Sequence, residues 1–359
     1  MSRQPSFPSG PSTGAPGPLH LDLVVQDETV VDVLPQIGFV HRGASSWKPA
    51  TTTSSSASER ICGICAMGHS LGYAETVESL MGVEVPKRAE YLRVIWHELS
   101  RIHSHLLWLG LAADAFGFES MFMHCWRLRE RVLDLFEKTT GGRVILSVVK
   151  VGGVVRDIDA SQMAEIVSVL DGIKGEYTQI MNTLLTDTSV KNRTVGVGHI
   201  TTEDAAALSM VGPFARASNL PYDVRSFGRG AYGDLADFAP ITATEGDCYA
   251  RVKVRCLEVL QSIEIIKELG AKIPAGDIAV PVKGAPAAGA QAANVVEQPR
   301  GECYYYARGN GSKYLERMRM RTPTSQNLAG MTTALAGCDL ADVNMIVLTI
   351  DPCISCTER

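Results

Sequence analysis

Apolar residues recur at three-and-four spacing through the middle of the chain, which predicts amphipathic helices. Within residues 86–116, the recurring apolar positions are Leu92, Ile95, Trp96, Leu99, Ile102, Leu106 and Leu109. Pro86 suits the first turn of this helix, because its missing N–H would have no partner there. The same spacing predicts further helices at 119–142, 159–187, 201–212 and 246–270.

Helix-end signals support these boundaries. Gly141 and Gly142 end the second helix, since glycine readily adopts the left-handed conformation that follows a helix. Asp159 or Ser161 caps the third helix at its beginning.

Alternation of apolar and polar residues predicts two β-hairpins, one near each end of the chain. The first covers residues 20–41 and turns at 26–28; the second covers 301–323 and turns at 309–311. Residues 344–353 form a short apolar run that leads to the last pair of cysteines. We expect a mainly α fold with small β-sheets (α+β) around a long central helix bundle.

Two segments look irregular. Residues 1–18 are rich in Pro, Gly and Ser and read as an N-terminal arm, which leaves residues 19–359 as a single domain. Residues 44–58 have few apolar anchors and are expected to form a loop.

Composition narrows the class of protein. The 359 residues are 45% hydrophobic with a net charge of -5, which argues against a general affinity for nucleic acid. The sequence contains neither a long uncharged apolar stretch nor the apolar region of a secretory signal. Five of the nine cysteines are isolated, which favours buried thiols in a reducing compartment over a disulfide framework. They are Cys125, Cys248, Cys256, Cys303 and Cys338.

The other four cysteines form two C-x-x-C pairs, Cys62 with Cys65 and Cys353 with Cys356. This spacing lets both sulfurs of a pair reach one metal, and Gly63 permits the sharp turn that this needs. Four thiolates suit zinc, nickel or an iron–sulfur cluster. Because nearly the whole chain separates the pairs, spacing alone leaves open a structural zinc, a catalytic metal or four unrelated thiols.

The residues around both pairs resemble the large subunit of nickel–iron hydrogenases. The first motif, R-x-C-G-x-C-x-x-x-H, runs from Arg60 to His69; the second, D-P-C-x-x-C followed by T-x-R, runs from Asp351 to Arg359. Residues 20–359 look most like the compact, membrane-associated, energy-converting (group 4) branch, which is related to the 49-kDa subunit of complex I. That complex I relative lacks the four cysteines, so their presence here favours a working metal site.

The resemblance implies a nickel–iron centre. Cys62 and Cys353 would bind nickel alone, while Cys65 and Cys356 would bridge nickel to an iron that carries carbonyl and cyanide ligands. Cys353 would be the nearest base during hydrogen cleavage.

Further site residues follow from the same resemblance. His69 would hydrogen-bond a bridging cysteine sulfur, and Arg300 would lie over the open metal position, with Asp351 pairing with Arg300 or orienting the turn. Thr324 and Ser325 match a hydroxyl site that donates to a cyanide nitrogen. The alternatives are a buried helix histidine, a surface turn arginine and ordinary turn hydroxyls.

Other residue types fall outside this implied site. His97, His103 and His105 share one helix, and we interpret them as packing and helix-surface residues. Cys303 and Cys338 are expected to be inert core thiols.

The sequence departs from the family in two places. Gly17 stands where many relatives have a proton-relaying glutamate, and Ser45 stands where a glutamate follows the "HRG" of residues 41–43. These changes affect proton delivery and a nearby accessory magnesium or iron site; Glu59 or a water chain is the expected replacement relay.

The predicted function is reversible hydrogen activation (2H⁺ + 2e⁻ ⇌ H₂). The alternatives are a non-catalytic, complex-I-like scaffold or docking subunit with a structural metal, and a zinc-stabilised helical protein. The resemblance implies a small subunit with an iron–sulfur cluster, ferredoxin-like subunits, integral membrane subunits and maturation factors. The chain is expected to be cytoplasmic and peripheral on the cell membrane, and either matured by cleavage after Arg359 or encoded without an extension.

Overall fold

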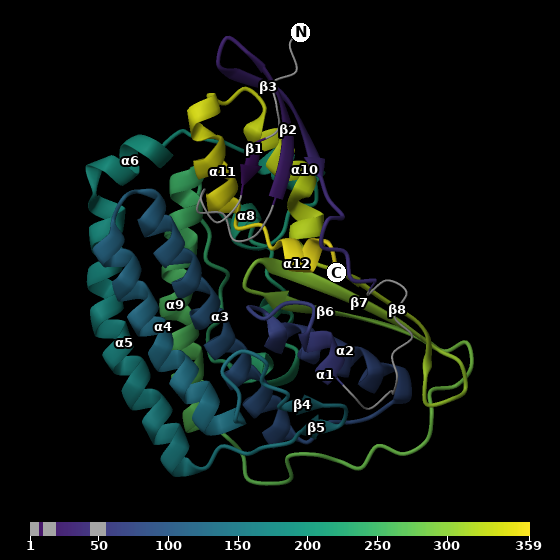
Figure 1. Ribbon diagram of the computed structural model, residues 1–359. Helices are drawn as coiled ribbons and strands as arrows, with labels where there is room; N and C mark the ends of the chain where they lie inside the picture. Colours follow the sequence, from purple (N-terminus) through teal and green to yellow (C-terminus); the bar gives the residue numbers. More distant parts are fainter. Residues whose placement is uncertain (1–6, 10–18, 44–54) are drawn as a thin grey trace.

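The fold is described by a computed structural model that covers residues 7–9, 19–43 and 55–359. Long helices form a layer on one side, and three small antiparallel sheets with short helices lie on the other (Figure 1). The predicted α+β class is confirmed. Among the described residues, no helix combines the length and the apolar character needed to cross a lipid bilayer.

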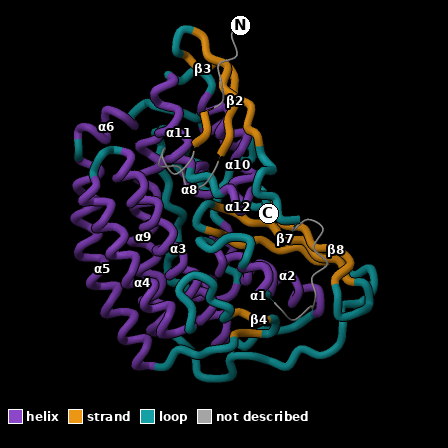
Figure 2. The backbone as a smooth tube through the Cα atoms, in the orientation of Figure 1, coloured by secondary structure: helices purple, strands orange, loops and turns teal. Residues whose placement is uncertain are grey.

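The long helices are those expected from the apolar spacing. The helix layer consists of α3 (Lys87–Ala115), α4 (Glu119–Thr140), α5 (Ala160–Thr186) and α9 (Cys248–Ala271). The backbone trace shows α3 between the outer helices and the sheet side of the molecule (Figure 2). Because α3 is covered on all sides, its polar residues are buried together with its apolar ones.

The helix ends follow the sequence signals. Pro86 is the N-cap of α3, and Gly141 ends α4 in the left-handed conformation at φ 85°. Asp159 caps α5 by accepting a hydrogen bond from the backbone N–H of Gln162, whose side chain bonds back to Asp159. Of the two predicted caps for α5, Asp159 is therefore correct.

Both predicted hairpins are present. β2 (Leu19–Gln26) pairs with β3 (Thr29–Gln36), and β7 (Gly301–Gly309) pairs with β8 (Leu315–Arg321). A third strand that the sequence pattern did not predict, β6 (Gln291–Gln298), pairs with β7. A two-stranded sheet joins β4 (Val149–Lys150) to β5 (Gly153–Val154).

Two segments expected to be irregular contain regular structure. In the N-terminal arm, β1 (Phe7–Ser9) pairs with β2, because an edge strand can use backbone hydrogen bonds whatever its composition. In the expected loop 44–58, Ser56 begins the helix α1 (Ser56–Glu59). The rest of both segments lies outside the described residues.

The shorter helices carry and support the cysteine motifs. They include α2 (Ala66–Met81) near the N-terminus and α6 (Thr188–Thr194), α7 (Thr202–Ala207) and α8 (Gly212–Arg216) in the middle of the chain. The 3-10 turns are η3 (Val224–Phe227), η4 (Gly230–Asp234) and η5 (Leu340–Asp342). The C-terminal helices are α10 (Pro323–Leu335), α11 (Val343–Ile350) and α12 (Ile354–Thr357).

The C-terminal helices lie between the β1–β2–β3 sheet and the β6–β7–β8 sheet, so the end of the chain sits inside the fold (Figure 1). The apolar run 344–353 is mostly helical, as α11, and the backbone then turns sharply at Asp351, which has a φ of 62°. The turn directs the last cysteine pair toward the first, and all four cysteines join the main hydrophobic core.

Candidate metal centre

The two C-x-x-C pairs meet in the core. The Sγ atoms of Cys62 and Cys353 are 3.4 Å apart, and those of Cys65 and Cys356 are 3.3 Å apart. Each cysteine loop leads into a helix: Cys65 is the N-cap of α2, and Cys353 is the N-cap of the short helix α12. The four thiols are at most 4% exposed, so they are shielded from bulk water.

The pKa values of the four thiols are shifted in opposite directions. A hydrogen bond from Cys353 lowers the pKa of the Cys62 thiol well below its ordinary value, and one from Cys356 lowers that of Cys353. The pKa values of Cys65 and Cys356 are raised, first of all by their hydrogen bonds with Cys353. Four buried sulfurs cannot all ionise without a cation, and a soft or borderline metal ion would supply that cation. The donor set therefore fits a thiolate-bound metal.

Three of these four sulfurs, all except that of Cys353, stand out among the potential ligands. In the described parts of the chain, the only group of three or more His, Cys, Asp or Glu ligand atoms within 4.8 Å of one another is Cys62, Cys65 and Cys356. An accessory magnesium or iron site remains a prediction that the fold does not test.

Arg300 and Asp351 pair beside the sulfurs. Arg300, in the turn between β6 and β7, donates from Nη2 to the carboxylate of Asp351 at 2.7 Å and from Nε to its backbone oxygen at 2.9 Å. Nη1 reaches the hydroxyl of Ser104 on α3 at 3.3 Å. Burial lowers the pKa of Arg300, but the charges of Asp351 and the nearby thiolates outweigh it and raise the pKa overall. A fixed positive charge therefore faces the cysteines.

His69 contacts a sulfur, as expected. Its Nε2 lies 3.4 Å from the Sγ of Cys356, and its Nδ1 lies 2.5 Å from the hydroxyl of Tyr305. Burial lowers the pKa of His69 to about 4, so the imidazole is neutral at neutral pH. A neutral ring that accepts from Tyr305 can donate its other N–H to the sulfur.

The structure separates Thr324 from Ser325. The hydroxyl of Thr324 accepts a hydrogen bond from the backbone N–H of Cys353 at 2.9 Å, so it belongs to the cysteine loop. Ser325 instead accepts from Nη1 of Arg359 at 3.1 Å. Arg359 also donates to the backbone oxygen of Met320, and it fixes the last turn of the chain against β8.

Arg42 joins the two cysteine loops, which the sequence analysis did not anticipate. Its Nη2 donates to the backbone oxygen of Ile61 at 2.9 Å and to that of Ser355 at 2.8 Å. Ile61 directly precedes Cys62, and Ser355 directly precedes Cys356. Arg42 is the arginine of the "HRG" triplet at residues 41–43. This family motif is the sequence feature from which a role for Arg42 could have been predicted.

The proposed replacement relay, Glu59, is buried on α1. Its carboxylate accepts from the backbone N–H of Ser147 at 2.9 and 3.1 Å and from the Ser147 hydroxyl at 3.2 Å. Burial raises the pKa of Glu59. Its relay role remains a prediction, and Gly17 and Ser45 lie outside the described residues.

The three α3 histidines are buried and have polar partners, so their interpretation as helix-surface residues is wrong. His105 contacts Glu258 at 2.9 Å, His103 contacts Arg129 at 2.8 Å and His97 contacts Tyr232 at 3.3 Å. Their packing role is confirmed.

All nine cysteines are free thiols, which agrees with the expected absence of a disulfide framework. Cys303 is fully buried, and burial raises its pKa to about 12. Cys338 is half-buried, and burial raises its pKa to about 11. Thiols this weakly acidic are unreactive at neutral pH.

The structure is an α+β fold that brings four buried thiols together, and comparison with known families identifies the class of protein that has this fold. The family of the respiratory-chain NADH dehydrogenase 49 Kd subunit matches residues 115–287 and 279–359, and the nickel-dependent hydrogenase family matches residues 50–112. The chain belongs to the family that unites these hydrogenases with the 49-kDa subunit.

Individual relatives agree with this assignment. The chain is 36% identical to the carbon monoxide-induced hydrogenase of Rhodospirillum rubrum, over 95% of each chain. It is 35% identical to a subunit of the F(420)H(2) dehydrogenase of Methanosarcina mazei, over 96% of this chain and 94% of the relative. It is 34% identical to the alpha subunit of the membrane-bound hydrogenase of Pyrococcus furiosus, over 98% and 87%. These relatives support an oxidoreductase role in a multisubunit assembly of the membrane-bound hydrogenase type.

Proposed function

We propose that this chain is the catalytic subunit of an energy-converting hydrogenase, which interconverts H₂ with two protons and two electrons at a nickel–iron centre. The observation that carries the proposal is the meeting of four buried thiols, from loops at opposite ends of the chain, in a member of a hydrogenase-containing family. A scaffold subunit that binds no metal has no need of four convergent sulfurs.

Cys62, Cys65, Cys353 and Cys356 would hold the centre, whose iron would carry carbonyl and cyanide ligands. When bound, the centre supplies the site at which H₂ is split heterolytically. The protein positions charge around it. Arg300, locked by Asp351, places a fixed guanidinium beside the sulfurs, where it can stabilise negative charge that develops there.

The chain also controls the sulfurs themselves. The Sγ of Cys353 is the base that takes the proton released from H₂. His69 hydrogen-bonds Cys356 and thereby withdraws charge from that sulfur. Thr324 holds the backbone of Cys353 and so fixes the position of the base.

Electrons must come through a partner, which we propose to be a small subunit carrying an iron–sulfur cluster, with ferredoxin-like and integral membrane subunits beyond it. Maturation factors would insert the metals. The chain would lie on the cytoplasmic face of the membrane, attached through these subunits.

A second candidate is a complex-I-like scaffold with a structural metal, favoured by the long match to the 49-kDa subunit. The test is metal analysis and infrared spectroscopy of the complex purified from cells that express the maturation factors. About one nickel per copy of this chain, iron in excess of nickel because of the partners' iron–sulfur clusters, carbonyl and cyanide bands, and H₂/D⁺ exchange are expected. Zinc, or a metal-free complex without these bands, would overturn the proposal.

A further inference from the structure

A cavity of about 630 Å³ opens between α2, α3, the turns η3 and η4, and strand β6. Its size is within the range of ligand-binding pockets. Its wall combines valines with several polar side chains, which include Glu75 from α2, His97 from α3, Tyr232 from η4 and Glu297 from β6. None of these four residues takes part in the metal centre described above.

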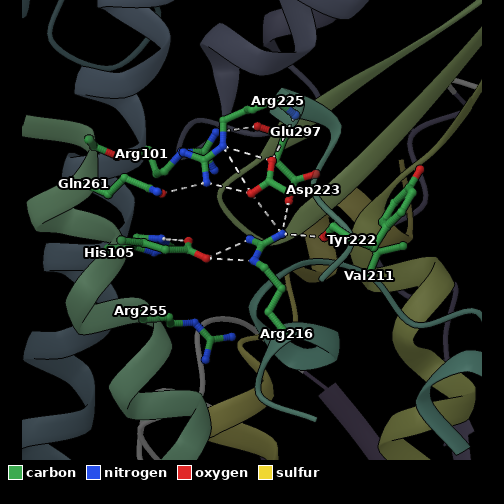
Figure 3. A network of polar contacts seen from close by, with 12 residues as sticks. Arg101, His105, Val211, Arg216, Tyr222, Asp223, Arg225, Arg255, Gln261 and Glu297 are labelled. Carbon is green, nitrogen blue, oxygen red and sulfur yellow. Dashed lines mark hydrogen bonds and ion pairs between the residues drawn. The ribbon is translucent and has the colours of Figure 1, made fainter. Parts of the chain in front are cut away.

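Behind the cavity lies a set of buried charges that we call the buried ion cluster. It consists of four carboxylates and three guanidiniums, each at most 2% exposed: Glu98, Asp223, Glu258, Glu297, Arg101, Arg216 and Arg225. Figure 3 shows how Arg216 extends toward Asp223 and how Glu297 lies beside Arg225. Arg216 contacts Glu258 and Glu297 at 2.8 Å each and Asp223 at 3.3 Å.

Among these seven residues, carboxylates outnumber guanidiniums by one. A further buried arginine, Arg255, interacts with Glu258 and Asp351, and Glu297 is not among its main charged neighbours. His105 contacts Glu258, but burial lowers its pKa to about 4, so it adds no positive charge at neutral pH. An unbalanced charge in a water-excluded site is expensive. One carboxyl of the cluster is therefore expected to hold a proton.

Glu297 is the carboxyl best placed to hold it. It lines the cavity, and it accepts only one hydrogen bond from a charged group, from Arg216 to Oε1 at 2.8 Å, and one from the backbone N–H of Val224 to Oε2 at 3.2 Å. Burial, followed by the charge of Asp223, raises the pKa of Glu297 to about 7. In contrast, Glu98 has two guanidinium partners and two hydroxyl donors, which keep its pKa low despite burial.

The charged groups that surround Glu297 come from every neighbouring element. They are Glu98 and Arg101 on α3, Arg216 on α8, Asp223 and Arg225 at η3, Glu258 on α9, and Glu302, its cross-strand neighbour on β7.

His97 offers a cavity water a hydrogen-bond acceptor. The hydroxyl of Tyr232 donates to Glu98 at 2.5 Å, so it can only accept from Nδ1 of His97, 3.3 Å away. The proton of this neutral ring is therefore on Nδ1, and Nε2 is an acceptor. His97 is 1% exposed and lines the cavity, and its Nε2 has no hydrogen-bond partner within the described part of the chain. A water molecule in the cavity satisfies such an acceptor.

Glu75 connects the cavity to solvent. It is half-buried, and its Oε2 accepts a hydrogen bond from the side chain of Asn294 at 2.6 Å. Asn294 is on β6, the strand that carries Glu297. Burial raises the pKa of Glu75 to about 7, so this carboxyl can gain and lose a proton under the same conditions as Glu297.

We propose that this cavity is a proton-exchange site, in which water carries a proton past Glu75 to Glu297, where it balances the buried ion cluster. The step is H₃O⁺ + Glu297–COO⁻ ⇌ Glu297–COOH + H₂O, and it needs no oxidant or reductant. Its use rests on the proposed function, since hydrogen chemistry exchanges protons and Glu297 is on the strand that leads to Arg300. The exchange itself does not depend on a metal.

The test is infrared spectroscopy of the full chain in metal-free form across pH. A protonated-carboxyl band that shifts in D₂O and titrates near pH 7 is expected in the unchanged protein. Glu297→Gln keeps a side-chain oxygen that can accept from the backbone N–H of Val224, and it should remove the part of this band that comes from Glu297. Glu75→Gln should remove the part of the band that comes from Glu75, and it should slow deuterium exchange at Glu297. Glu84→Gln is the matched control, because Glu84 lines the cavity at its exposed rim; it leaves the band unchanged.

The outcomes separate the two proposals. A chain with no titrating carboxyl band near pH 7, or a band that Glu297→Gln leaves intact, overturns the proton-exchange site even if the complex evolves hydrogen. A chain that shows the band but never binds nickel overturns the hydrogenase proposal and leaves the exchange site standing.

Discussion

Cys62 and Cys353 are 291 positions apart in the chain, yet their sulfur atoms lie 3.4 Å from each other in the core. Neither loop can form the four-thiol site alone, so metal binding should depend on both ends of the chain. Replacing either cysteine leaves three sulfur ligands and a less favourable site for a soft metal.

We expect Cys62→Ser and Cys353→Ser each to abolish nickel retention and hydrogen turnover. Because a ligand that binds only the folded state stabilises it, the wild-type chain should also melt at a higher temperature with metal than without, and the variants should not. Cys338→Ser, which changes a half-buried thiol outside the centre, is the control and should keep its metal. Full nickel content in either variant would contradict the proposed ligand set.

Arg42 should determine how firmly the two cysteine loops are held together. Arg42→Gln loses the bridge from one guanidinium nitrogen to the carbonyls of Ile61 and Ser355. We expect weaker nickel binding and faster removal of the C-terminal residues by carboxypeptidase in the metal-free chain. The cost should be roughly 0.5–1.5 kcal/mol, because Arg42 is exposed and water can replace part of each hydrogen bond.

The control for Arg42 is Arg60→Gln, since Arg60 is exposed and bonds only locally, to the backbone oxygen of Ser56. Carboxypeptidase digestion that proceeds at the same rate in Arg42→Gln and in the wild type would show that the bridge does not hold the loops.

Arg300→Lys separates charge from geometry. Lysine keeps the positive charge but cannot make the parallel contacts of the guanidinium with the carboxylate and backbone oxygen of Asp351. We expect hydrogen turnover to fall by roughly 100-fold, the usual effect of removing one positioned donor, with nickel content unchanged. Arg308→Lys changes a half-buried arginine on β7 that pairs with Glu316, away from the cysteines, and should be silent in both assays. Normal turnover in Arg300→Lys would exclude a positioned guanidinium.

A substitution at Gly72 tests whether the position of Tyr305 supports His69. A Cβ at Gly72 would lie 2.5 Å from a ring carbon of Tyr305, whose hydroxyl bonds to His69. We expect Gly72→Ala to displace that ring, lower the melting temperature and shift the infrared bands of the loaded centre. Gly175→Ala on α5 meets no atom within 4 Å and should instead stabilise the protein by about 0.5–1 kcal/mol. Equal effects of the two changes would contradict the close approach.

Stability should fall on acidification because of buried histidines. Burial, followed by the charge of Arg129, lowers the pKa of His103 to about 3 from its ordinary 6.5. The unfolded state therefore binds more protons between these values, and stability present above pH 6.5 is lost as the pH falls toward 3. His103→Gln, which can still accept from Arg129, should flatten the pH dependence of urea unfolding over this range. An unchanged slope would show that His103 does not contribute.

The sequence predicted the long helices well because their spacing and caps are local signals. Gly141 and Asp159 mark ends that depend on residues within one turn. The short strands β1 (Phe7–Ser9) and β6 (Gln291–Gln298) gave no comparable signal, because each is defined by its backbone pairing with the following strand and not by an apolar pattern of its own.

The candidate site was predictable only where a motif carried it. The family motifs predicted that the four cysteines, Arg300 and His69 would lie close together, and the structure places them close together. Ser325 could not be separated from Thr324, since adjacent residues at a helix start point in different directions. The buried ion cluster was missed because α3 looks amphipathic locally, and only its neighbours make it a fully buried helix.

The meeting of Cys62 with Cys353 has a consequence for how the protein folds. A metal that joins the two loops closes a ring of almost the entire chain, and such a cross-link removes on the order of 5 kcal/mol of unfolded-state entropy. Contacts this distant in sequence form late, after the helix layer between them has assembled. The metal would then hold the two cysteine loops together after the rest of the protein has folded. Its loss would loosen the contacts between these loops first and leave the helix layer intact.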